Sequence, residues 1–330
     1  MNLKTVLINR KTFPGSQSIE YLFSNLYQKW REKGLAIESK QLPYYSKGLI
    51  NRILNTLYLL KYRNHIVHIT GDVYYAILGA ILCKRIITIH DLSFLERSNG
   101  LARKILKLFW IILPVKFSHK VTVVSHATKD AVLKEVPEAE HKIEIIYNFV
   151  DEGFKPIERT FNTQNPRILQ IGTAFNKNIQ RLCEALEGIS CILIIIGELS
   201  ESQRKKIRKH RIIYENRYNL NQKELIHEYE KADLLAFVST VEGFGMPIIE
   251  AQACGLPVVT SNISSMPEIA SDGAILVSPY DIDIIRKGIL KLISNEELRS
   301  SLVKAGYKNA VLYSKEKIAE QYLEVYQSLA

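Results

Sequence analysis

The sequence predicts an α/β protein made of two doubly wound domains, each with a parallel sheet. Short, β-branched apolar runs alternate with longer helical patterns, as buried parallel strands and their crossover helices do. One polar passage without strands interrupts this alternation, and Pro156 and Pro166 break regular structure within it. A chain of 330 residues is long enough for two such domains.

The first domain is expected to span residues 1–152. Its predicted strands are nearly continuous apolar runs, at residues 5–9, 66–70, 85–90, 120–125 and 143–148. Helical patterns lie between them, in "SIEYLFSNLYQKWREKG", "YYAILGAILCK", "ARKILKLFWIILPVKF" and "HATKDAVLKEV". Strands that alternate with helices in this way are typical of βαβ units in a parallel sheet.

Residues 153–166 are predicted to form a linker, and residues 167–314 a second domain of the same kind. Its predicted strands occupy residues 167–172, 191–197, 211–216, 233–239, 257–261 and 273–278. The last segment, 315–330, is an amphipathic helix, and packing back on the first domain is one arrangement open to it. Ligands of doubly wound sheets bind beyond the carboxyl ends of the strands, so we expect a cleft where the two domains face each other.

The net charge of +10 comes entirely from the first half of the chain. Residues 1–165 hold 24 Lys and Arg against 14 Asp and Glu, whereas residues 166–330 hold 20 of each kind. A basic half suits an anionic membrane, a nucleic acid or an anionic substrate, as well as an ordinary solvated surface. No RNP-type or helix-turn-helix signature is present, so nucleic acid is not expected as a partner.

Composition and missing motifs exclude several other classes. No apolar run is long enough to span a bilayer, and the N-terminus lacks an apolar signal region, so a cytoplasmic protein is expected. The four cysteines lie among apolar neighbours without CxxC spacing, which predicts buried, reduced thiols. Neither GxGxxG nor GxxxxGK[ST] occurs, which disfavours a nicotinamide enzyme and a P-loop kinase.

The stretch "VEGFGMPIIE" carries the strongest chemical signal. It follows a predicted strand, and Pro247 suits the first turn of the helix that begins there. Gly243 and Gly245 let the backbone pass close to a ligand, and the N–H groups of a helix start attract a phosphate. Glu242 and Glu250 stand on either side, and carboxylates are good acceptors for vicinal sugar hydroxyls. The combination predicts a nucleotide-sugar site.

The stretch from residue 242 to residue 281, "EGFGMPIIEAQACGLPVVTSNISSMPEIASDGAILVSPYD", resembles the signature of the retaining glycosyltransferases of family four. The resemblance extends more thinly over the first half. It implies the GT-B fold, in which two Rossmann-like domains face each other across a cleft. It also implies transfer with retention of anomeric configuration, no cofactor and no metal, and no DxD-type metal dyad is found in a suitable loop. The N-terminal domain is then expected to bind the acceptor.

The same resemblance assigns the donor-binding residues. It implies that Glu250 binds the ribose hydroxyls. Glu242 is implied to hold the transferred sugar and its phosphates, together with the backbone of Gly243, Phe244, Gly245 and Met246. Lys177, in "IGTAFNKNIQRL", is implied to neutralise the donor diphosphate. Thr173 stands in the same loop where many members have an arginine.

Further residues are assigned by position. Asn216 and Arg217, at the end of a predicted strand, are implied to lie near the base. His90, in "TIHDLSFLE", is implied to contact the donor sugar, so Glu242 and His90 are the two candidate catalytic residues. A buried core histidine is the alternative for His90. Gly15 and Ser16 occupy the place of a Gly-rich phosphate loop, with one glycine where a pair is common.

The predicted function is transfer of a hexosyl-type sugar from a UDP- or GDP-linked donor. The acceptor is expected to be a glycan or a lipid-linked molecule of bacterial cell-surface polysaccharide or lipopolysaccharide synthesis. Residues 102–117 join Arg103, Lys104, Lys107 and Lys116 to Leu, Phe and Trp, so they are expected to touch an anionic membrane at its inner face, unless the helix is buried. A GT-B epimerase or phosphorylase, or a non-catalytic nucleotide-sugar-binding subunit, remains an alternative.

Overall fold

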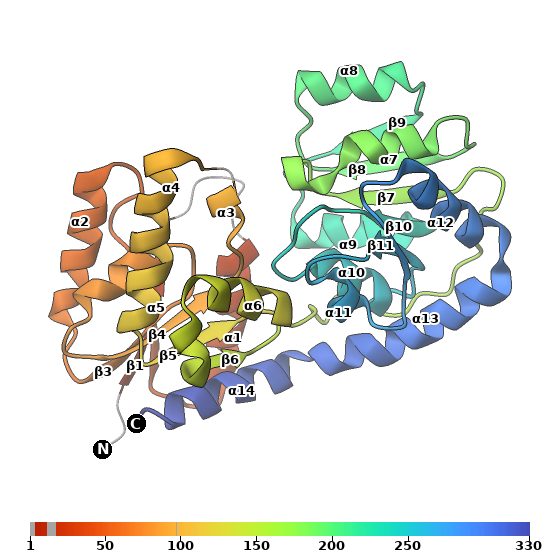
Figure 1. Ribbon diagram of the computed structural model, residues 1–330. Coiled ribbons are helices and arrows are strands. Elements are labelled where there is room, and N and C mark those ends of the chain that lie inside the picture. Colours follow the sequence, from red (N-terminus) through yellow and green to blue (C-terminus); the bar gives the residue numbers. More distant parts are fainter. Residues whose placement is uncertain (1–3, 12–17, 97) are drawn as a thin grey trace. The chain divides into compact units, whose positions relative to one another are not determined.

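The computed structural model of the chain, which describes residues 4–11, 18–96 and 98–330, contains two compact units (Figure 1). Unit 1 comprises Met1–Phe149 and Lys315–Ala330, and unit 2 comprises Val150–Ser314. Each unit contains a six-stranded parallel sheet with helices around it. The prediction of an α/β protein with two doubly wound sheets is therefore confirmed.

The sheet of unit 1 has the strand order β2-β1-β3-β4-β5-β6. Its strands are β1 (Lys4–Asn9), β2 (Ile37–Gln41), β3 (His65–Ile69), β4 (Lys84–Ile89), β5 (Lys120–Val123) and β6 (Ile143–Ile145). Strand β2 was not predicted from the sequence. Its sequence, "IESKQ", is polar because β2 is an edge strand that only begins in the core, at Ile37.

Unit 1 contains the following helices, two of which were not predicted from the sequence. They are α1 (Ser18–Glu32), α2 (Leu49–Tyr58), α3 (Ser93–Glu96), α4 (Gly100–Leu106), α5 (Leu113–Phe117), α6 (His126–Glu135) and α14 (Lys315–Gln327). The two that were not predicted are the short α3 and α2, which continues into the 3₁₀ turn η1 (Leu59–Lys61). The run "YYAILGAILCK" was predicted to be an α-helix but contains the 3₁₀ segment η2 (Tyr74–Gly79). Two further segments are η3 (Lys107–Ile112), a π-helical stretch, and η4 (Pro137–Lys142).

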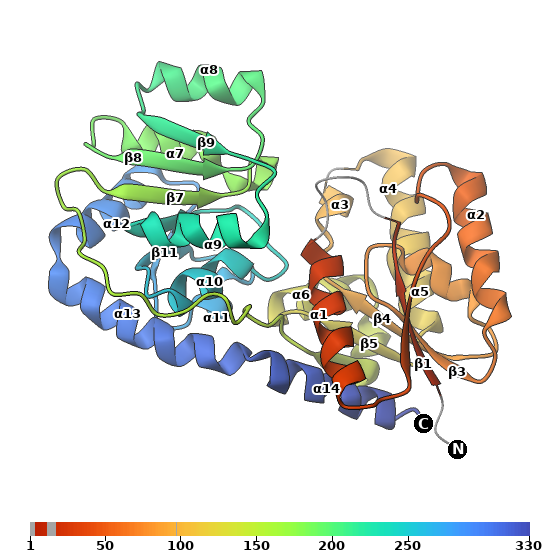
Figure 2. The same ribbon diagram turned by 180° about the vertical axis from the view of Figure 1, so that it is seen from behind.

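The C-terminal helix α14 packs on unit 1 beside α1 (Figure 2). The indole Nε1 of buried Trp30 donates a hydrogen bond to the Ala319 carbonyl at 3.1 Å. The buried imidazole of His68 in β3 shares hydrogen bonds with the Tyr326 hydroxyl (2.8 Å) and the Thr88 hydroxyl (2.7 Å). This polar network joins α14 to the centre of the sheet, so the helix is an integral part of unit 1.

The sheet of unit 2 has the order β12-β11-β10-β7-β8-β9. Its strands are β7 (Arg167–Ile171), β8 (Ile192–Ile196), β9 (Tyr214–Arg217), β10 (Leu234–Phe237), β11 (Val258–Ser261) and β12 (Ile275–Val277). Residues 153–166 contain neither helix nor strand and belong to this unit. Because β7 and β10 are parallel neighbours, the loops that follow them emerge at the same edge of the sheet.

The helices of unit 2 cover both faces of its sheet. They are α7 (Ile179–Leu186), α8 (Glu201–Lys209), α9 (Gln222–Lys231), α10 (Met246–Ala253), α11 (Met266–Ala270), α12 (Ile282–Ser294) and α13 (Glu296–Ala310), with short 3₁₀ turns η5 (Phe175–Lys177) and η6 (Val311–Tyr313). All four cysteines are buried and free, as predicted. No helix in the described ranges is long and apolar enough to cross a membrane.

Candidate functional site

The loops after β7 and β10 bring Lys177 and Glu242 into contact. The ammonium Nζ of Lys177 lies 2.5 Å from Glu242 Oε1, and both side chains are less than a fifth exposed. The neighbouring Asn176 donates its Nδ2 to the Val241 carbonyl at 2.8 Å and to Glu242 Oε1 at 3.3 Å. An ammonium carries three donors, so the contact with Glu242 leaves Lys177 able to bind an anion as well.

Two glycines shape these loops. Gly172, at the end of β7, has a φ of +86°, and a Cβ at this position would meet Lys177 Cε at 2.9 Å. Gly245 caps the start of α10 with a φ of +107°. Both φ values lie in the left-handed region that favours glycine. Gly172 therefore makes room for the lysine, and Gly245 turns the chain into the helix.

A buried serine on a separate segment holds the Glu242 loop in place. The Ser265 hydroxyl, just before α11, lies 3.0 Å from the Glu242 carbonyl and 2.7 Å from the Phe244 carbonyl. The neighbouring Ser264 also donates to the Glu242 carbonyl, at 2.7 Å, and accepts from the Glu242 N–H at 3.2 Å. The position of Glu242 thus depends on residues about twenty positions away in sequence.

Glu250 lies one turn into α10 and is mostly buried. Its Oε2 accepts a hydrogen bond from the Tyr229 hydroxyl at 2.5 Å, from the last part of α9. Burial raises the pKa of Glu250 to about 7, with a further raising effect of Asp151, while Tyr229 and Lys177 act in the opposite direction. A carboxyl group whose pKa is close to 7 can donate a hydrogen bond when protonated and accept one when ionised, and such shifted groups are common at functional sites.

The start of α10 offers backbone donors only before its proline. Pro247 has no N–H, and the Ile248 N–H bonds to the Gly245 carbonyl at 2.9 Å. Any anion at this helix end therefore depends on the amides of residues 243–246. The Phe244 side chain is buried against Tyr313, with 5.7 Å between ring centroids, so Phe244 offers a ligand only its backbone.

Thr173 faces the neighbouring strand of the sheet. Its hydroxyl donates to the Glu198 carbonyl at 2.8 Å, and its own carbonyl accepts from Gln203 Nε2 at 2.7 Å. Gly197 permits this approach, because a Cβ there would meet Thr173 Cγ2 at 3.0 Å. The residue that stands in place of the expected arginine therefore ties the β7 loop to the start of α8.

The side chains of Asn216 and Arg217, at the end of β9, both have protein partners. Asn216 Nδ2 donates to the carbonyls of Ile195 (3.0 Å) and Gly197 (2.7 Å). Arg217 forms an ion pair with Glu215 at 2.7 Å. Asn216 consequently fixes the edge strand to β8, so a base that binds here would meet mainly backbone groups.

The remaining predicted site residues belong to unit 1. His90 follows β4, and its Nε2 lies 2.9 Å from the Thr70 carbonyl, which requires a proton on Nε2. Burial lowers the pKa of His90, although nearby carboxylates oppose this effect. The predicted phosphate-loop residues Gly15 and Ser16 lie outside the described residues.

Several residues that complete the site were not predicted from the sequence. They are Asn176, Tyr229, Ser264 and Ser265, together with Asn178, whose Nδ2 donates to the Val238 carbonyl at 2.9 Å. Asn178 has a φ of +56° and caps α7. The two asparagines on either side of Lys177 in "FNKN" are a usable signal, since asparagine is favoured in left-handed and capping positions. Nothing in the sequence alone connects Tyr229 to Glu250.

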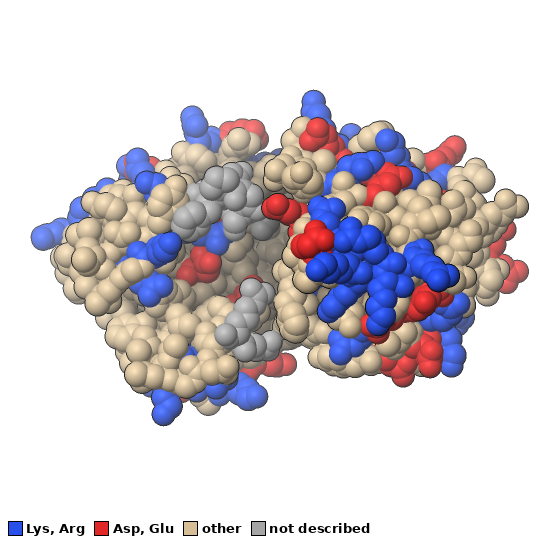
Figure 3. Space-filling model, turned by 90° about the horizontal axis from the view of Figure 1, so that it is seen from above, with Lys and Arg blue, Asp and Glu red and all other residues tan. Residues whose placement is uncertain are grey.

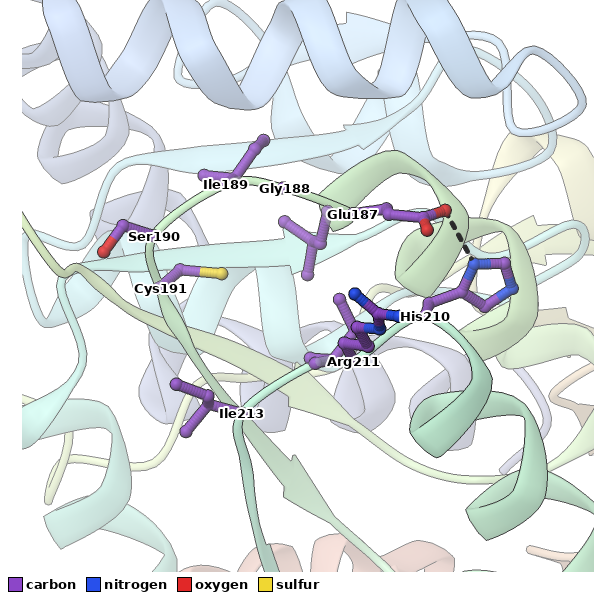
Figure 4. A pocket seen from close by; sticks show the side chains of 10 residues that line it. Glu187, Gly188, Ile189, Ser190, Cys191, His210, Arg211 and Ile213 are labelled. Atoms are coloured by element: carbon purple, nitrogen blue, oxygen red, sulfur yellow. Dashed lines mark hydrogen bonds and ion pairs between the residues drawn. The ribbon is translucent and has the colours of Figure 1, made fainter.

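A cavity of about 510 Å³ lies elsewhere in unit 2, between the end of α7 and the amino ends of β8 and β9 (Figure 4). His210 and Glu187 line it, with 3.0 Å between Nδ1 and Oε2. None of the predicted site residues borders this cavity. Within the described parts of the chain, no group of three His, Cys, Asp or Glu side chains is placed to hold a metal ion.

Two family models match the chain in consecutive segments. The model for glycosyl transferases group 1 matches residues 152–309, and that for glycosyltransferase family 4 matches residues 29–154. The first match contains Lys177, Glu242 and Glu250, and the second contains His90. The two models together span residues 29–309, which is most of the chain.

Known proteins agree with these matches. O-antigen chain mannosyltransferase B of Escherichia coli is 35% identical over 106 residues, which cover 32% of this chain and 28% of that protein. O-antigen chain mannosyltransferase RfbU of Salmonella typhimurium is 27% identical over 215 residues, covering 61% of this chain and 58% of that protein. The alignments thus span from about a quarter to three fifths of these relatives.

Among solved structures, Anabaena HepE in complex with UDP and glucose has a TM-score of 0.77 at 14% identity. The alignment covers 99% of this chain and all of that one, which shows a shared GT-B fold. With consecutive matches to both family models and the predicted fold, the chain belongs to the glycosyltransferases of family 4.

Proposed function

We propose that the protein transfers a hexosyl-type sugar from a nucleoside-diphosphate sugar to a glycan or lipid-linked acceptor. The observation that carries this proposal is the contact between Lys177 and Glu242 at the edge of the unit 2 sheet, whose lysine also acts electrostatically on the buried carboxyl of Glu250. Lys177 matches the diphosphate of such a ligand, Glu242 its sugar and Glu250 its ribose.

Each residue has a separate task in this proposal. The Lys177 ammonium attracts the diphosphate, and the amides before Pro247 add donors to the same oxygens. Glu242 accepts hydrogen bonds from hydroxyls of the transferred sugar. Glu250 accepts from the two ribose hydroxyls, for which a carboxylate has two suitable oxygens. Thr173 leaves Lys177 with a larger share of the phosphate charge than in relatives that have an arginine there.

The proposed reaction breaks the bond between the anomeric carbon and the diphosphate oxygen, and the diphosphate leaves with the electron pair. The acceptor hydroxyl oxygen forms the new bond to the anomeric carbon from the same face, so the configuration is retained. Its proton passes to the departing phosphate oxygen. Lys177 stabilises the negative charge that grows on the phosphate, which is the usual source of rate enhancement in such a step. No metal ion takes part in this scheme.

His90 is proposed to contact the donor sugar as a neutral imidazole. Its Nε2–H is committed to the Thr70 carbonyl, so Nδ1 is the ring atom that can accept from a sugar hydroxyl. Burial lowers the pKa of His90 and favours this neutral form. The imidazole would then orient the sugar rather than supply a proton.

We further propose that the acceptor belongs to bacterial polysaccharide or lipopolysaccharide synthesis at the cytoplasmic face of the inner membrane. The names of the two O-antigen mannosyltransferases support this acceptor class, and mannose is accordingly the first sugar to test. The HepE complex with UDP and glucose supports a nucleotide-sugar donor.

A donor panel tests the proposal. The protein is incubated with UDP- and GDP-linked hexoses, with and without a membrane-lipid extract, and release of UDP or GDP is measured. We expect release with one donor and loss of at least about 100-fold in turnover for Glu242→Gln. Binding without release would identify a non-catalytic subunit, and unchanged turnover of Glu242→Gln would remove the proposed role of that residue. NMR of the product's anomeric signal tests retention.

A further inference from the structure

Helix α2 of unit 1 has its apolar side chains turned away from the protein. Six large aliphatic residues of α2 and the following turn are exposed: Leu49, Ile50, Ile53, Leu54, Leu57 and Leu60. Leu49 and Ile50 are 72% and 73% exposed, whereas Asn55, on the opposite face, is completely buried. A surface helix of a globular protein normally has the reverse arrangement, with its apolar stripe facing the core.

Polar contacts hold α2 in this orientation. The Asn55 side chain accepts from the Tyr44 N–H at 3.1 Å and donates to the Tyr44 carbonyl at 3.0 Å. The Arg52 guanidinium lies over the Trp110 ring, 4.6 Å from its centroid. Gly79 allows very close approach, because a Cβ there would clash with the Thr56 carbonyl. The exposed apolar face is therefore a feature of the packed fold.

A second exposed stripe lies on the segment beside α2. Leu101, Ile105, Leu108 and Phe109 are exposed along α4 and η3, at the spacing of one helical face. The stacking of Arg52 on Trp110 joins α2 to η3, and α2 and α4 lie side by side in both views of unit 1 (Figures 1 and 2). Trp110 itself is only 9% exposed and belongs to the core. We call the two stripes together the α2–α4 face.

The two sequence segments that form the α2–α4 face contain basic residues and no acidic ones. Between Glu38 and Asp72 the chain has five Lys or Arg and no acidic residue, and between Glu96 and Asp130 it has seven and none. Two of the basic residues predicted to meet a membrane are paired elsewhere, since Lys107 contacts Glu135 and Lys116 contacts Glu138. Lys104 is exposed and forms no ion pair with any described residue.

Helix α8 of unit 2 shows that basic charge alone does not produce such a face. Lys and Arg gather over α8 in Figure 3, and the sequence of this helix, "ESQRKKIRK", contains five of them. Its single aliphatic residue, Ile207, is fully buried. Helix α8 is thus an ordinary solvated basic helix, whereas the α2–α4 face combines basic residues with exposed aliphatic side chains.

We propose that the α2–α4 face inserts into the interfacial layer of an anionic phospholipid bilayer. Two adjacent amphipathic segments would lie in the membrane plane, with their aliphatic side chains among the acyl chains and their Lys and Arg side chains at the anionic headgroups. The predicted contact through residues 102–117 is thereby extended, and α2 supplies most of the apolar surface. This inference does not depend on the proposed sugar transfer.

Vesicle flotation tests the proposal with the full chain. The probe is vesicles of phosphatidylcholine mixed with phosphatidylglycerol, compared with vesicles of phosphatidylcholine alone. The test variant is Ile50→Gln/Ile53→Gln/Leu57→Gln, and the control is Ile213→Gln/Val311→Gln, two aliphatic positions of unit 2 that are also exposed. We expect the test variant to bind the anionic vesicles about ten-fold or more weakly than the control and the wild type.

A second pair of variants tests the electrostatic part. Lys61→Gln/Lys104→Gln is expected to weaken binding to the anionic vesicles, while Lys205→Gln/Lys209→Gln on α8 leaves it unchanged. Equal binding by the wild type and the α2 variant would overturn the proposal, as would a wild type that binds no vesicles. A wild type that sediments as a dimer, with an α2 variant that is monomeric, would assign the face to a second copy instead. Circular dichroism verifies that the variants are folded.

Discussion

The raised pKa of Glu250 predicts that Glu250→Gln stabilises unit 2 while weakening nucleotide binding. In the free protein the Glu250 carboxyl is mostly buried, and burial raises its pKa from an ordinary value of 4.5 to about 7. Glutamine has nearly the same shape and can still accept from the Tyr229 hydroxyl, but it has no charge to bury. The wild type therefore bears a cost of ionisation that the variant lacks.

The sign and size of this effect follow from linkage. Below about pH 4.5 the carboxyl is protonated in the folded and the unfolded protein, so it contributes no difference. Between about pH 4.5 and about pH 7 only the unfolded chain ionises, and the wild type loses about 1.4 kcal/mol of unfolding free energy per pH unit. Above about pH 7 the loss levels off at about 3 kcal/mol, as an upper limit. The variant should show no such loss at this site.

Hydrogen exchange of α10 amides measures the effect within unit 2. Tryptophan fluorescence does not serve, because Trp30 and Trp110, the two tryptophans of the chain, both belong to unit 1. We expect the advantage of Glu250→Gln over the wild type to grow as pH rises and then level off, while nucleotide affinity falls about ten-fold or more. Glu296→Gln, at an exposed helix start, is the control. Parallel pH profiles of Glu250→Gln and the wild type would refute the reasoning.

Three further predictions concern the supports of the site and the core of unit 1. Gly172→Ala should lose about 1 kcal/mol of stability and much of its turnover, because the added Cβ displaces Lys177. The control is Gly188→Ala, where φ is +75° and an added Cβ meets no atom, so this variant should lose stability only. Equal turnover of the two variants would contradict this. Ser265→Ala should lose about 1–3 kcal/mol and bind nucleotide more weakly by calorimetry, since the Phe244 carbonyl loses the Ser265 hydroxyl while the Glu242 carbonyl keeps Ser264; unchanged binding would show that the loop does not need Ser265. Unit 1 should lose stability as pH falls from about 6.5 toward 3, because burial lowers the pKa of His68 to about 3. In His68→Gln, the unfolding free energy from urea unfolding followed by tryptophan fluorescence should fall less steeply with decreasing pH than in the wild type.

The fold was largely predictable because most strands contain a buried run of mainly β-branched and apolar residues, as in β4, β8 and β10. The exceptions are informative. Strand β2 is polar because it lies at the sheet edge, so its composition does not distinguish it from a loop. Helix α2 has helical periodicity, but periodicity gives the existence of two faces and not which of them meets the core. The contacts of Asn55 and the close approach at Gly79 decide that orientation, and both are tertiary.

The candidate site was also predictable from the sequence only in part. Glu242 and Glu250 could be singled out because they share one loop and helix, so their spacing is written in a single stretch of sequence. The contact between Lys177 and Glu242 depends on the pairing of β7 with β10, which the order of strands along the chain does not reveal. The sheet order β12-β11-β10-β7 supplies that neighbourhood. The motif alone therefore identified Glu242 and Glu250, whereas the order of strands in the sheet brings Lys177 to Glu242.

The geometry of the site is supported by residues outside the motif. Tyr229 on α9 donates to Glu250, Asn176 donates beside Glu242, and Ser265 fixes the carbonyls of the loop between them. Because these supports come from separate segments, a substitution at any of them should alter ligand binding without changing a residue of the motif. Two relatives with identical "EGFGMPIIE" motifs can then differ in donor affinity, and the cause should be sought at the positions of Asn176, Tyr229 and Ser265.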